Sequence, residues 1–183
     1  MLLYRQTVED FGLYPGKELS EQQLAQLQEA AGAMSAKMRA VRIVAASAVS
    51  KRDLEYRLVQ KGESLENAAD AVAWMSDMHL VDDAETARQV VGRCIAKGYG
   101  LQRAKQALYE KKIPKQYWEA ALAGYPDQTE HILVFLRGRL VDTSDQKAVK
   151  KAVDALLRRG HSYHQIRAAM GHLSMDPEEF PEE

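Results

Sequence analysis

The chain is 183 residues long and 46% hydrophobic, and its 25 basic and 26 acidic side chains give a formal net charge of -1, which excludes a uniformly cationic surface. Its one cysteine, Cys94, excludes an intramolecular disulfide and favours the cytoplasm as the compartment. The amino terminus turns polar too early for a signal peptide, and no stretch approaches the roughly 18 apolar residues of a membrane span, so we expect a soluble protein.

The residues between the predicted turns are typical of helices. Alanine, leucine and valine carry most of the apolar content, charged residues and glutamine lie between them, and aromatic residues make up only 7% of the chain. Glycine, proline or a short polar residue interrupts the sequence about every dozen positions. No stretch alternates apolar and polar residues as a strand would. The sequence therefore predicts an all-α protein.

Capping signals delimit the first helices. Ser20 begins a long helix that runs to about Ser47. Ser50 with Asp53 three residues later resembles a capping box, and Gly62 ends the short helix that these residues begin.

Two more helices lead into the middle of the chain. Ser64 begins the first of them. Asp82 and Asp83 cap the second, which runs to Lys97. Gly98 ends it, because glycine readily takes the left-handed conformation that closes a helix.

Shorter helices follow in the second half. One follows Gly100 and runs to about Lys112, and Pro114 suits the first turn of another that ends at Gly124. The turn that begins at Gly124 is a candidate linker. Beyond it we predict three helices, at 129–141, 144–159 and 163–171. An acidic tail at 176–183 is predicted to be disordered.

An internal repeat relates these helices at an offset of 50 residues. At this offset Leu58 aligns with Leu108, Lys61 aligns with Lys111, and helix starts fall on helix starts. A third copy of the short helix begins at Ser162. Each unit consists of a longer helix, a hinge, a short helix and a third helix.

A three-helix unit of about 45 residues is too small to bury its apolar faces well by itself, so neighbouring units have to complete one another's cores. We therefore expect tandem three-helix repeats that form an elongated, curved array with a concave surface suited to another extended molecule. The predicted divisions are an amino-terminal extension (1–36), repeat 1 (37–81), repeat 2 (82–123), a linker with repeat 3 (124–175) and the tail (176–183).

The middle repeat carries residues typical of one family. Leu80-Val81-Asp82-Asp83 is followed by Lys97-Gly98-Tyr99-Gly100 and then by Ala107-Leu108-Tyr109-Glu110-Lys111-Lys112-Ile113. In this order, they resemble the L-D-D-x-x-F-A, K-G-Y-G-P-x-R-I and E-L-x-x-K-G-I segments of the RecX family.

The resemblance covers residues 37–173. Ala40-Val41-Arg42-Ile43-Val44, leading to Ser50-Lys51-Arg52-Asp53-Leu54, is similar to the family's first repeat, and Ala155-Leu156-Leu157-Arg158-Arg159-Gly160-His161-Ser162 is similar to its final module. The segment 11–20 resembles the extension of the longer members. Three residues depart from the family pattern. Thr86 stands where the family has phenylalanine, Leu101 where it has proline, and Lys112 where it has glycine.

The resemblance implies a modular helical protein that is not an enzyme and that binds the RecA recombinase filament, within its helical groove. It implies that the protein modulates, and mainly inhibits, the ATPase, strand-exchange and coprotease activities of RecA. Weak direct contact with DNA is compatible with this role. We expect a monomer with no cofactor, no metal and no membrane association.

Charge is segregated along the chain although the total nearly cancels. Residues 63–88 hold seven acidic side chains against Arg88, and residues 93–115 hold seven basic ones against Glu110. A basic concave stripe could bind an acidic protein surface or phosphates, whereas the alternative is an ordinary solvated helical face. We expect partner recognition to involve side chains of the middle and last repeats: Arg93, Lys97, Tyr99, Arg103, Lys105, Lys111, Lys150, Arg158 and Arg159.

Some residues have both a structural and a functional interpretation. Tyr99 lies between two glycines and either packs as a wedge at a helix corner or, if exposed, contacts the partner. The aspartate pair 82–83 favours a cap over a metal site, because no third carboxylate lies at the spacing of a calcium loop. His161 and His164 lack the partners of a zinc site, and Cys94 has no nearby base that would make it a nucleophile.

A second hypothesis is a small DNA-binding protein whose three-helix units act as helix-turn-helix modules. The near-neutral total charge argues against it. Binding to naked DNA without RecA would favour this hypothesis, whereas binding only to the nucleoprotein filament would favour the first. An enzyme lacks support, because the sequence offers no nucleophile with a base, no metal cluster and no nucleotide loop.

Overall fold

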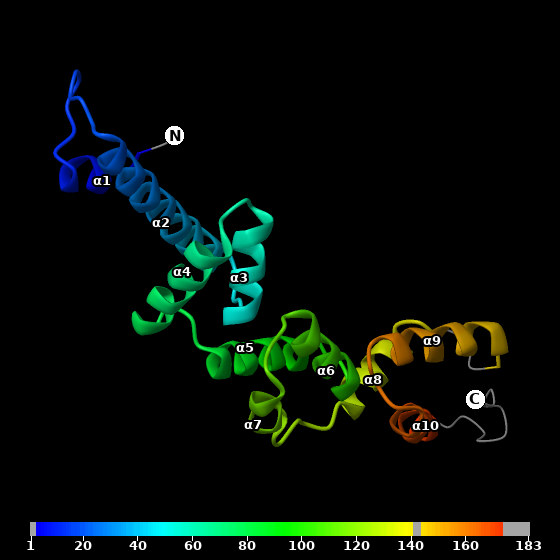
Figure 1. The fold of residues 1–183 in the computed structure, drawn as a ribbon. Coiled ribbons are helices and arrows are strands. Elements are labelled where there is room, and N and C mark those ends of the chain that lie inside the picture. Colours follow the sequence, from blue (N-terminus) through cyan, green and yellow to red (C-terminus); the bar gives the residue numbers. More distant parts are fainter. Residues whose placement is uncertain (1–2, 141–143, 174–183) are drawn as a thin grey trace. The chain divides into compact units, whose positions relative to one another are not determined.

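A computed structural model describes residues 3–140 and 144–173, and every regular element in these residues is a helix (Figure 1). The prediction of an all-α protein is confirmed. The predicted acidic tail, 176–183, lies outside the described residues. None of the described helices combines the length and the apolar character needed to cross a membrane. The helices are α1 (Arg5–Asp10), α2 (Glu21–Ala46), α3 (Lys51–Gln60), α4 (Leu65–Asp77), α5 (Asp83–Ala96), α6 (Leu101–Glu110), the 3-10 helix η1 (Lys115–Tyr117), α7 (Trp118–Leu122), α8 (Thr129–Arg137), α9 (Gln146–Arg158) and α10 (Tyr163–Gly171).

Serine caps begin the helices where the sequence predicts them. The Oγ of Ser20 accepts a hydrogen bond from the amide of Gln23, whose side chain returns to the amide of Ser20 at 3.0 Å and so completes a capping box. Ser162 and Gln165 form the same arrangement at the start of α10. Each cap satisfies amides that the first turn of a helix leaves without partners.

Three helices of the carboxyl half differ in detail from the prediction. Pro114 precedes the helix as its cap, and the first turn after it is the 3-10 helix η1. The helix predicted to reach residue 141 ends at Arg137, and the next one begins at Gln146 because the carboxylate of Asp145 accepts hydrogen bonds from two amides of its first turn.

The chain divides into two compact units. The amino-terminal unit comprises the residues up to Thr86 together with Lys111–Ile113, and the carboxyl-terminal unit comprises Ala87–Glu110 and the chain from Pro114 onward. The predicted division into three repeats stays a prediction.

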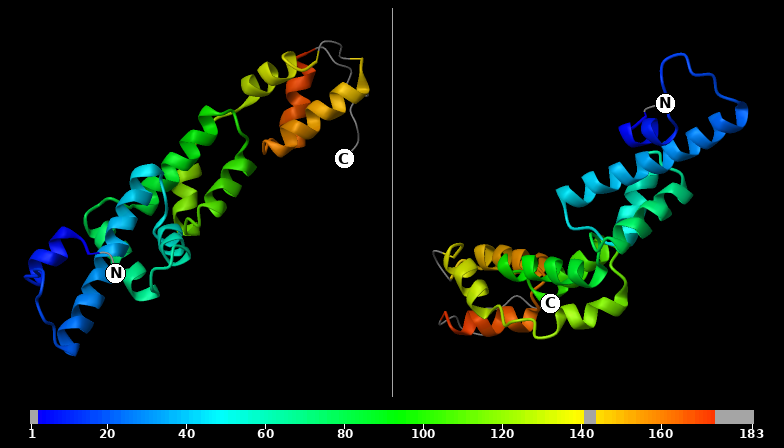
Figure 2. Two further views of the ribbon diagram at one scale, coloured as in Figure 1. Left: turned by 90° about the horizontal axis from the view of Figure 1, so that it is seen from above. Right: turned by 90° about the vertical axis from the view of Figure 1, so that its left-hand side faces the viewer.

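The amino-terminal unit is built on α2, α3 and α4. Figure 2 shows these three helices side by side. Leu54 and Leu58 of α3 and Met75 of α4 are completely buried between them, and Trp74 packs half-buried against the same core. Leu54 and Leu58, one helical turn apart, therefore mark the buried face of α3.

The start of α3 is held by polar contacts from distant parts of the chain. The Oγ of Ser50 donates to the carbonyl of Lys111 at 2.6 Å, and the amide of Lys51 donates to the carboxylate of Asp83 at 2.8 Å. Thr86, where the family pattern has phenylalanine, donates from its Oγ1 to the carbonyl of Val49 at 3.2 Å. Threonine at this position therefore has a structural role that an aromatic ring could not supply.

Asp53 departs from the capping box that the sequence suggests. Its amide does donate to Ser50 at 3.1 Å, but its buried carboxylate pairs with Arg57 at 2.9 Å and with Lys112 at 3.2 Å. The side chain of Asp53 thus joins α3 to the turn after α6, because that turn brings a cation to it.

Lys112 occupies a backbone conformation that favours glycine, with φ at 52°. Its ammonium group pairs with Asp53 and lies 3.8 Å from the centre of the Tyr56 ring. We expect K112A to lower the free energy of unfolding by about 1 kcal/mol, because the contacts are lost while the unfavourable φ remains. K112G should be more stable than K112A by about 1 kcal/mol, since it relieves the backbone. Urea denaturation of the two variants checks this order, and K112A at least as stable as K112G would contradict it.

The carboxyl-terminal unit has its core between α8, α9 and α10. The largest buried side chains come from all three helices: Ile132, Leu136, Val149, Leu156, Ile166 and Met170. In α6 the same spacing of buried residues recurs, with Ala104 and Leu108 completely buried.

Candidate functional site

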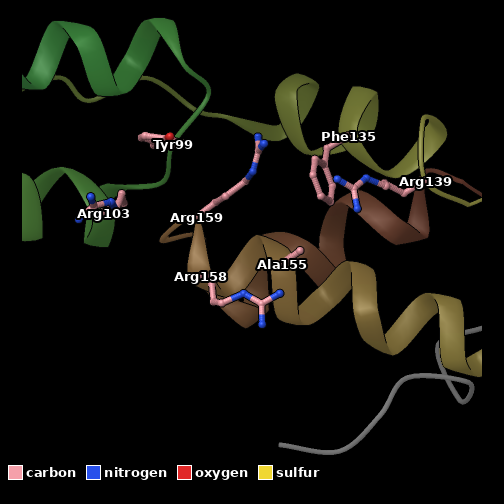
Figure 3. Close-up of a pocket in the computed structure, with 7 residues that line it drawn as sticks. All are labelled: Tyr99, Arg103, Phe135, Arg139, Ala155, Arg158 and Arg159. Atoms are coloured by element: carbon pink, nitrogen blue, oxygen red, sulfur yellow. The ribbon is translucent and has the colours of Figure 1, made fainter.

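An open pocket in the carboxyl-terminal unit gathers four arginines and two aromatic rings. Its volume is about 270 Å³, and Figure 3 shows the side chains that line it. We name it the arginine pocket. Its lining residues are Tyr99, Arg103, Phe135, Arg139, Ala155, Arg158 and Arg159.

Backbone contacts bring the lining residues together. The amide of Gly100 donates to the carbonyl of Arg159 at 2.9 Å, and the amide of Gln102 donates to the carbonyl of Gly160 at 3.2 Å. These two bonds hold the start of α6, which carries Arg103, against the end of α9.

Two glycines make this close approach possible. A Cβ on Gly100 would overlap the backbone of Gly160, and a Cβ on Gly160 would overlap the backbone of Arg103. Gly160 also has a φ of 86°, in the left-handed region. The side of the pocket between α6 and α9 therefore depends on the absence of side chains at both positions.

Arg159 is the central cation of the pocket. Its guanidinium lies 4.7 Å from the ring centre of Phe135 and 6.0 Å from that of Tyr99, and Figure 3 shows it extending between the two rings. Arg139 lies 5.1 Å from the ring centre of Phe135. Contacts of this kind hold a guanidinium in place without neutralising its charge, so the donors stay available to an anion.

The four arginines differ in how much of their charge is compensated. Arg103 pairs with Glu110 at 2.9 Å, and this hydrogen bond lowers the pKa of Glu110 and raises that of Arg103. In the described part of the chain no carboxylate forms an ion pair with the other three, Arg139, Arg158 and Arg159. The pocket is therefore a cationic site, suited to carboxylates or phosphates.

The corner that carries Tyr99 is fixed from two sides. The hydroxyl of Tyr125 donates to the carbonyl of Tyr99 at 2.7 Å, and burial raises the pKa of Tyr125 to about 12, so this donor keeps its proton. His161 Nε2 lies 3.0 Å from the carbonyl of Gly98, to which it donates. Tyr99 itself is half-buried, so it packs at the helix corner and also presents its ring to the pocket.

His161 makes the stability of this unit depend on pH. Burial lowers its pKa, the charges of Arg159 and His131 lower it further, and the bond to Gly98 opposes the change. The folded histidine is therefore neutral where the unfolded one, with a pKa of about 6.5, already binds a proton. The stability that comes from burying a neutral His161 is fully present above about pH 6.5 and is lost as the pH falls toward the folded-state pKa.

Urea denaturation at about pH 7.5 and about pH 5.5 measures this effect. We expect H161Q to lose less stability than the wild type between the two values, since glutamine does not titrate. H164Q, which replaces an exposed histidine in the next helix, should keep the wild-type pH dependence. Equal pH dependence in the wild type and H161Q would contradict the assignment.

The structure brings together four of the nine predicted recognition residues. Tyr99, Arg103, Arg158 and Arg159 line the arginine pocket. Lys111 belongs to the amino-terminal unit, where its ammonium group donates to the carbonyl of Ala48 at 3.4 Å. The remaining four lie in the carboxyl-terminal unit but do not line the pocket: Arg93, Lys97, Lys105 and Lys150.

Sequence reasoning missed Phe135 and Arg139. The two residues are four positions apart, which would place them on one face of the helix predicted at 129–141, although Arg139 follows the end of α8 in the structure. Neither belongs to the repeat that relates the first two modules, so the correspondence between repeats does not point to them.

The side chains of the arginine pocket are chemically suited to anions and planar groups. Cys94 is buried, and burial raises the pKa of its thiol, so the thiol is protonated at neutral pH. Histidine, cysteine, aspartate and glutamate side chains form no group of three at metal-binding distances in the described ranges.

Comparisons with known proteins give a consistent result. Residues 82–122 match the family model described as RecX, second three-helix domain. The regulatory protein RecX of Xanthomonas axonopodis pv. citri is 31% identical over 123 residues, which are 66% of this chain and 76% of that protein. The regulatory protein RecX of Vibrio campbellii is 25% identical over 140 residues, which are 75% of this chain and 90% of that protein.

Solved structures share the fold. A crystal structure of a regulatory protein RecX superposes with a TM-score of 0.69 at 19% identity, covering 92% of this chain and 88% of that one. RecX from Lactobacillus salivarius gives a TM-score of 0.65 at 20% identity, covering 79% of this chain and 98% of that one.

Proposed function

This chain belongs to the RecX family of regulatory proteins, and we propose that it binds the RecA recombinase filament through the arginine pocket. Binding there would modulate, and mainly inhibit, ATP hydrolysis, strand exchange and coprotease activity of RecA. We further propose that it acts in the cytoplasm as a monomer, without a cofactor and without enzymatic activity of its own.

One observation supports this proposal above the others. Arg139, Arg158 and Arg159 lie around one pocket without carboxylate partners among the described residues, and Arg159 is held between two aromatic rings. Uncompensated cations that are already ordered lose little side-chain entropy when an anionic group binds. Arginine and tyrosine are also the residues that most often dominate the binding energy of protein interfaces.

A bound protein of this kind can inhibit RecA without any chemistry. It can obstruct access of duplex DNA or of other proteins to the filament, and it can restrain the motions of neighbouring protomers that accompany ATP hydrolysis. We propose that five further cations add flanking contacts to the filament: Arg93, Lys97, Lys105, Lys111 and Lys150. Charges at the edge of a binding interface raise the association rate more than they strengthen the final complex.

Co-sedimentation tests the proposal. The protein is mixed with RecA filaments assembled on single-stranded DNA, with free RecA, and with the same DNA alone. We expect it to sediment with the filament and to bind the naked DNA at least about tenfold more weakly at about 0.15 M salt.

The opposite result would favour a direct DNA-binding module. Equal binding to naked DNA and to the filament, with affinity that falls steeply as salt rises, would contradict RecA recognition and support the second hypothesis. Failure to sediment with either would contradict both.

A further inference from the structure

A second cationic pocket lies in the amino-terminal unit, between α2 and α3. It is larger than the arginine pocket, with a volume of about 500 Å³. None of the predicted recognition residues lines it. Its lining residues are Arg39, Arg42, Ile43, Ala46, Ser47, Arg57 and Lys61.

Buried carboxylates hold two of its arginines in place. Arg39 pairs through Nε with Glu63 at 2.8 Å and donates through a terminal nitrogen to the carbonyl of Lys61 at 2.7 Å. Glu63 is in turn fixed by the Oγ of Ser35 at 3.0 Å. Arg57 pairs with Asp53 at 2.9 Å. The carboxylate side chains are only 8% and 6% exposed, so these two guanidiniums are ordered walls of the pocket.

The other two cations have no such compensation. Arg42 and Lys61 are exposed, and neither side chain forms an ion pair within residues 3–140 and 144–173. Glu63 pairs with Arg39, and Asp53 is shared between Arg57 and Lys112, so at least about two positive charges remain at the pocket. A ligand with two or more negative groups is electrostatically complementary to it.

The apolar part of the lining restricts which anion fits. Ile43 and Ala46 contribute aliphatic surface, and the seven lining residues include no aromatic ring. Proteins that bind single strands without sequence preference stack bases on aromatic side chains, and this pocket offers none. An aliphatic side chain flanked by carboxylates would use both the cations and the apolar surface.

We propose that this pocket binds an acidic peptide segment with an aliphatic side chain, supplied by a protein partner. The segment places its aliphatic group against Ile43 and Ala46 and its carboxylates against Arg42 and Lys61. The inference goes beyond the proposed function, because it concerns the other compact unit and holds whichever protein supplies the segment. Two pockets on one chain also give a partner with repeated sites a route to higher avidity.

A synthetic peptide with one leucine between runs of glutamate tests the proposal, using fluorescence anisotropy. The full chain carries R139E and R158E as a background, so that the arginine pocket does not contribute to the signal. We expect R42E/K61E to weaken peptide binding at least about tenfold. The matched control K51E/R52E reverses two exposed charges on α3 outside the pocket, and should change affinity less than about threefold at about 0.15 M salt.

Two further probes separate the alternatives. Replacing the leucine of the peptide with serine should weaken binding by about fivefold, since the aliphatic contact is lost. A labelled oligothymidine should bind more weakly than the leucine peptide. The proposal is overturned if R42E/K61E and K51E/R52E have equal effects, if the serine peptide binds as well, or if the oligonucleotide binds more tightly. Because the background removes the arginine pocket, none of these outcomes bears on RecA recognition there.

Discussion

Replacing Gly160 with alanine should lower the free energy of unfolding by about 3–5 kcal/mol, the largest effect that we expect from a single added methyl group in this protein. Two costs combine. The φ of 86° is unfavourable for any residue with a Cβ, and the added carbon overlaps the backbone of Arg103. Relief requires the start of α6 to move away from the end of α9, which breaks the bonds from Gly100 and Gln102.

Gly62 provides a matched control. Its φ is 91°, nearly the same as that of Gly160, but a Cβ there meets no atom within 4 Å. G62A should therefore lose only the conformational part, about 1–2 kcal/mol. Urea denaturation of both variants gives the comparison, and equal losses would show that the close approach of α6 and α9 contributes nothing.

Gly100 and Gly92 allow the same comparison at positions without a left-handed backbone. A Cβ on Gly100 overlaps the backbone of Gly160, whereas one on Gly92 meets nothing within 4 Å. G92A should stabilise the protein by about 0.5–1 kcal/mol, since alanine is the better residue within a helix, while G100A should destabilise it.

The double variant R139E/R158E should lose most of its inhibition of RecA-catalysed ATP hydrolysis. We expect the concentration that gives half inhibition to rise at least about tenfold, because two uncompensated cations of the arginine pocket become anions. Both side chains are exposed, so the helical content measured by circular dichroism should be unchanged.

A control with the same change in net charge separates the pocket from general electrostatics. K147E/K151E reverses two exposed lysines of α9 that do not line the pocket. Neither lysine lines the pocket, and salt at about 0.15 M weakens exposed charges that make no direct contact, so this variant should inhibit nearly as well as the wild type. Equal loss in the two variants would remove the arginine pocket from the account of RecA binding.

Local signals explain why most of the fold could be predicted. The starts of α2, α4 and α10 depend on a serine that bonds an amide three residues later, and such a pair is visible in the sequence. The buried faces of α3 and α6 follow from apolar residues one turn apart. The short α1 escaped prediction, because its cap, Tyr4, makes no side-chain hydrogen bond that would mark its start.

The candidate site was less predictable, because contacts distant in sequence assemble it. Tyr99 and Arg159 were expected to take part in recognition, but the contact of Arg159 with Phe135 depends on α8 packing beside α9 and α10. Asp53 looked like a local cap, yet besides Arg57 its carboxylate has a second partner, Lys112, from a turn almost sixty residues further on. Helix periodicity identifies which face is buried, but it does not identify the segment that covers it.

The close approach of α6 and α9 has a consequence for how this sequence can vary. The obstacles to a side chain at positions 100 and 160 are mainly main-chain atoms, and no replacement elsewhere in the chain removes main-chain atoms. In a library of all single substitutions selected for a folded product, both positions should therefore retain only glycine. Position 62, which shares the backbone conformation but has open space, should also accept asparagine.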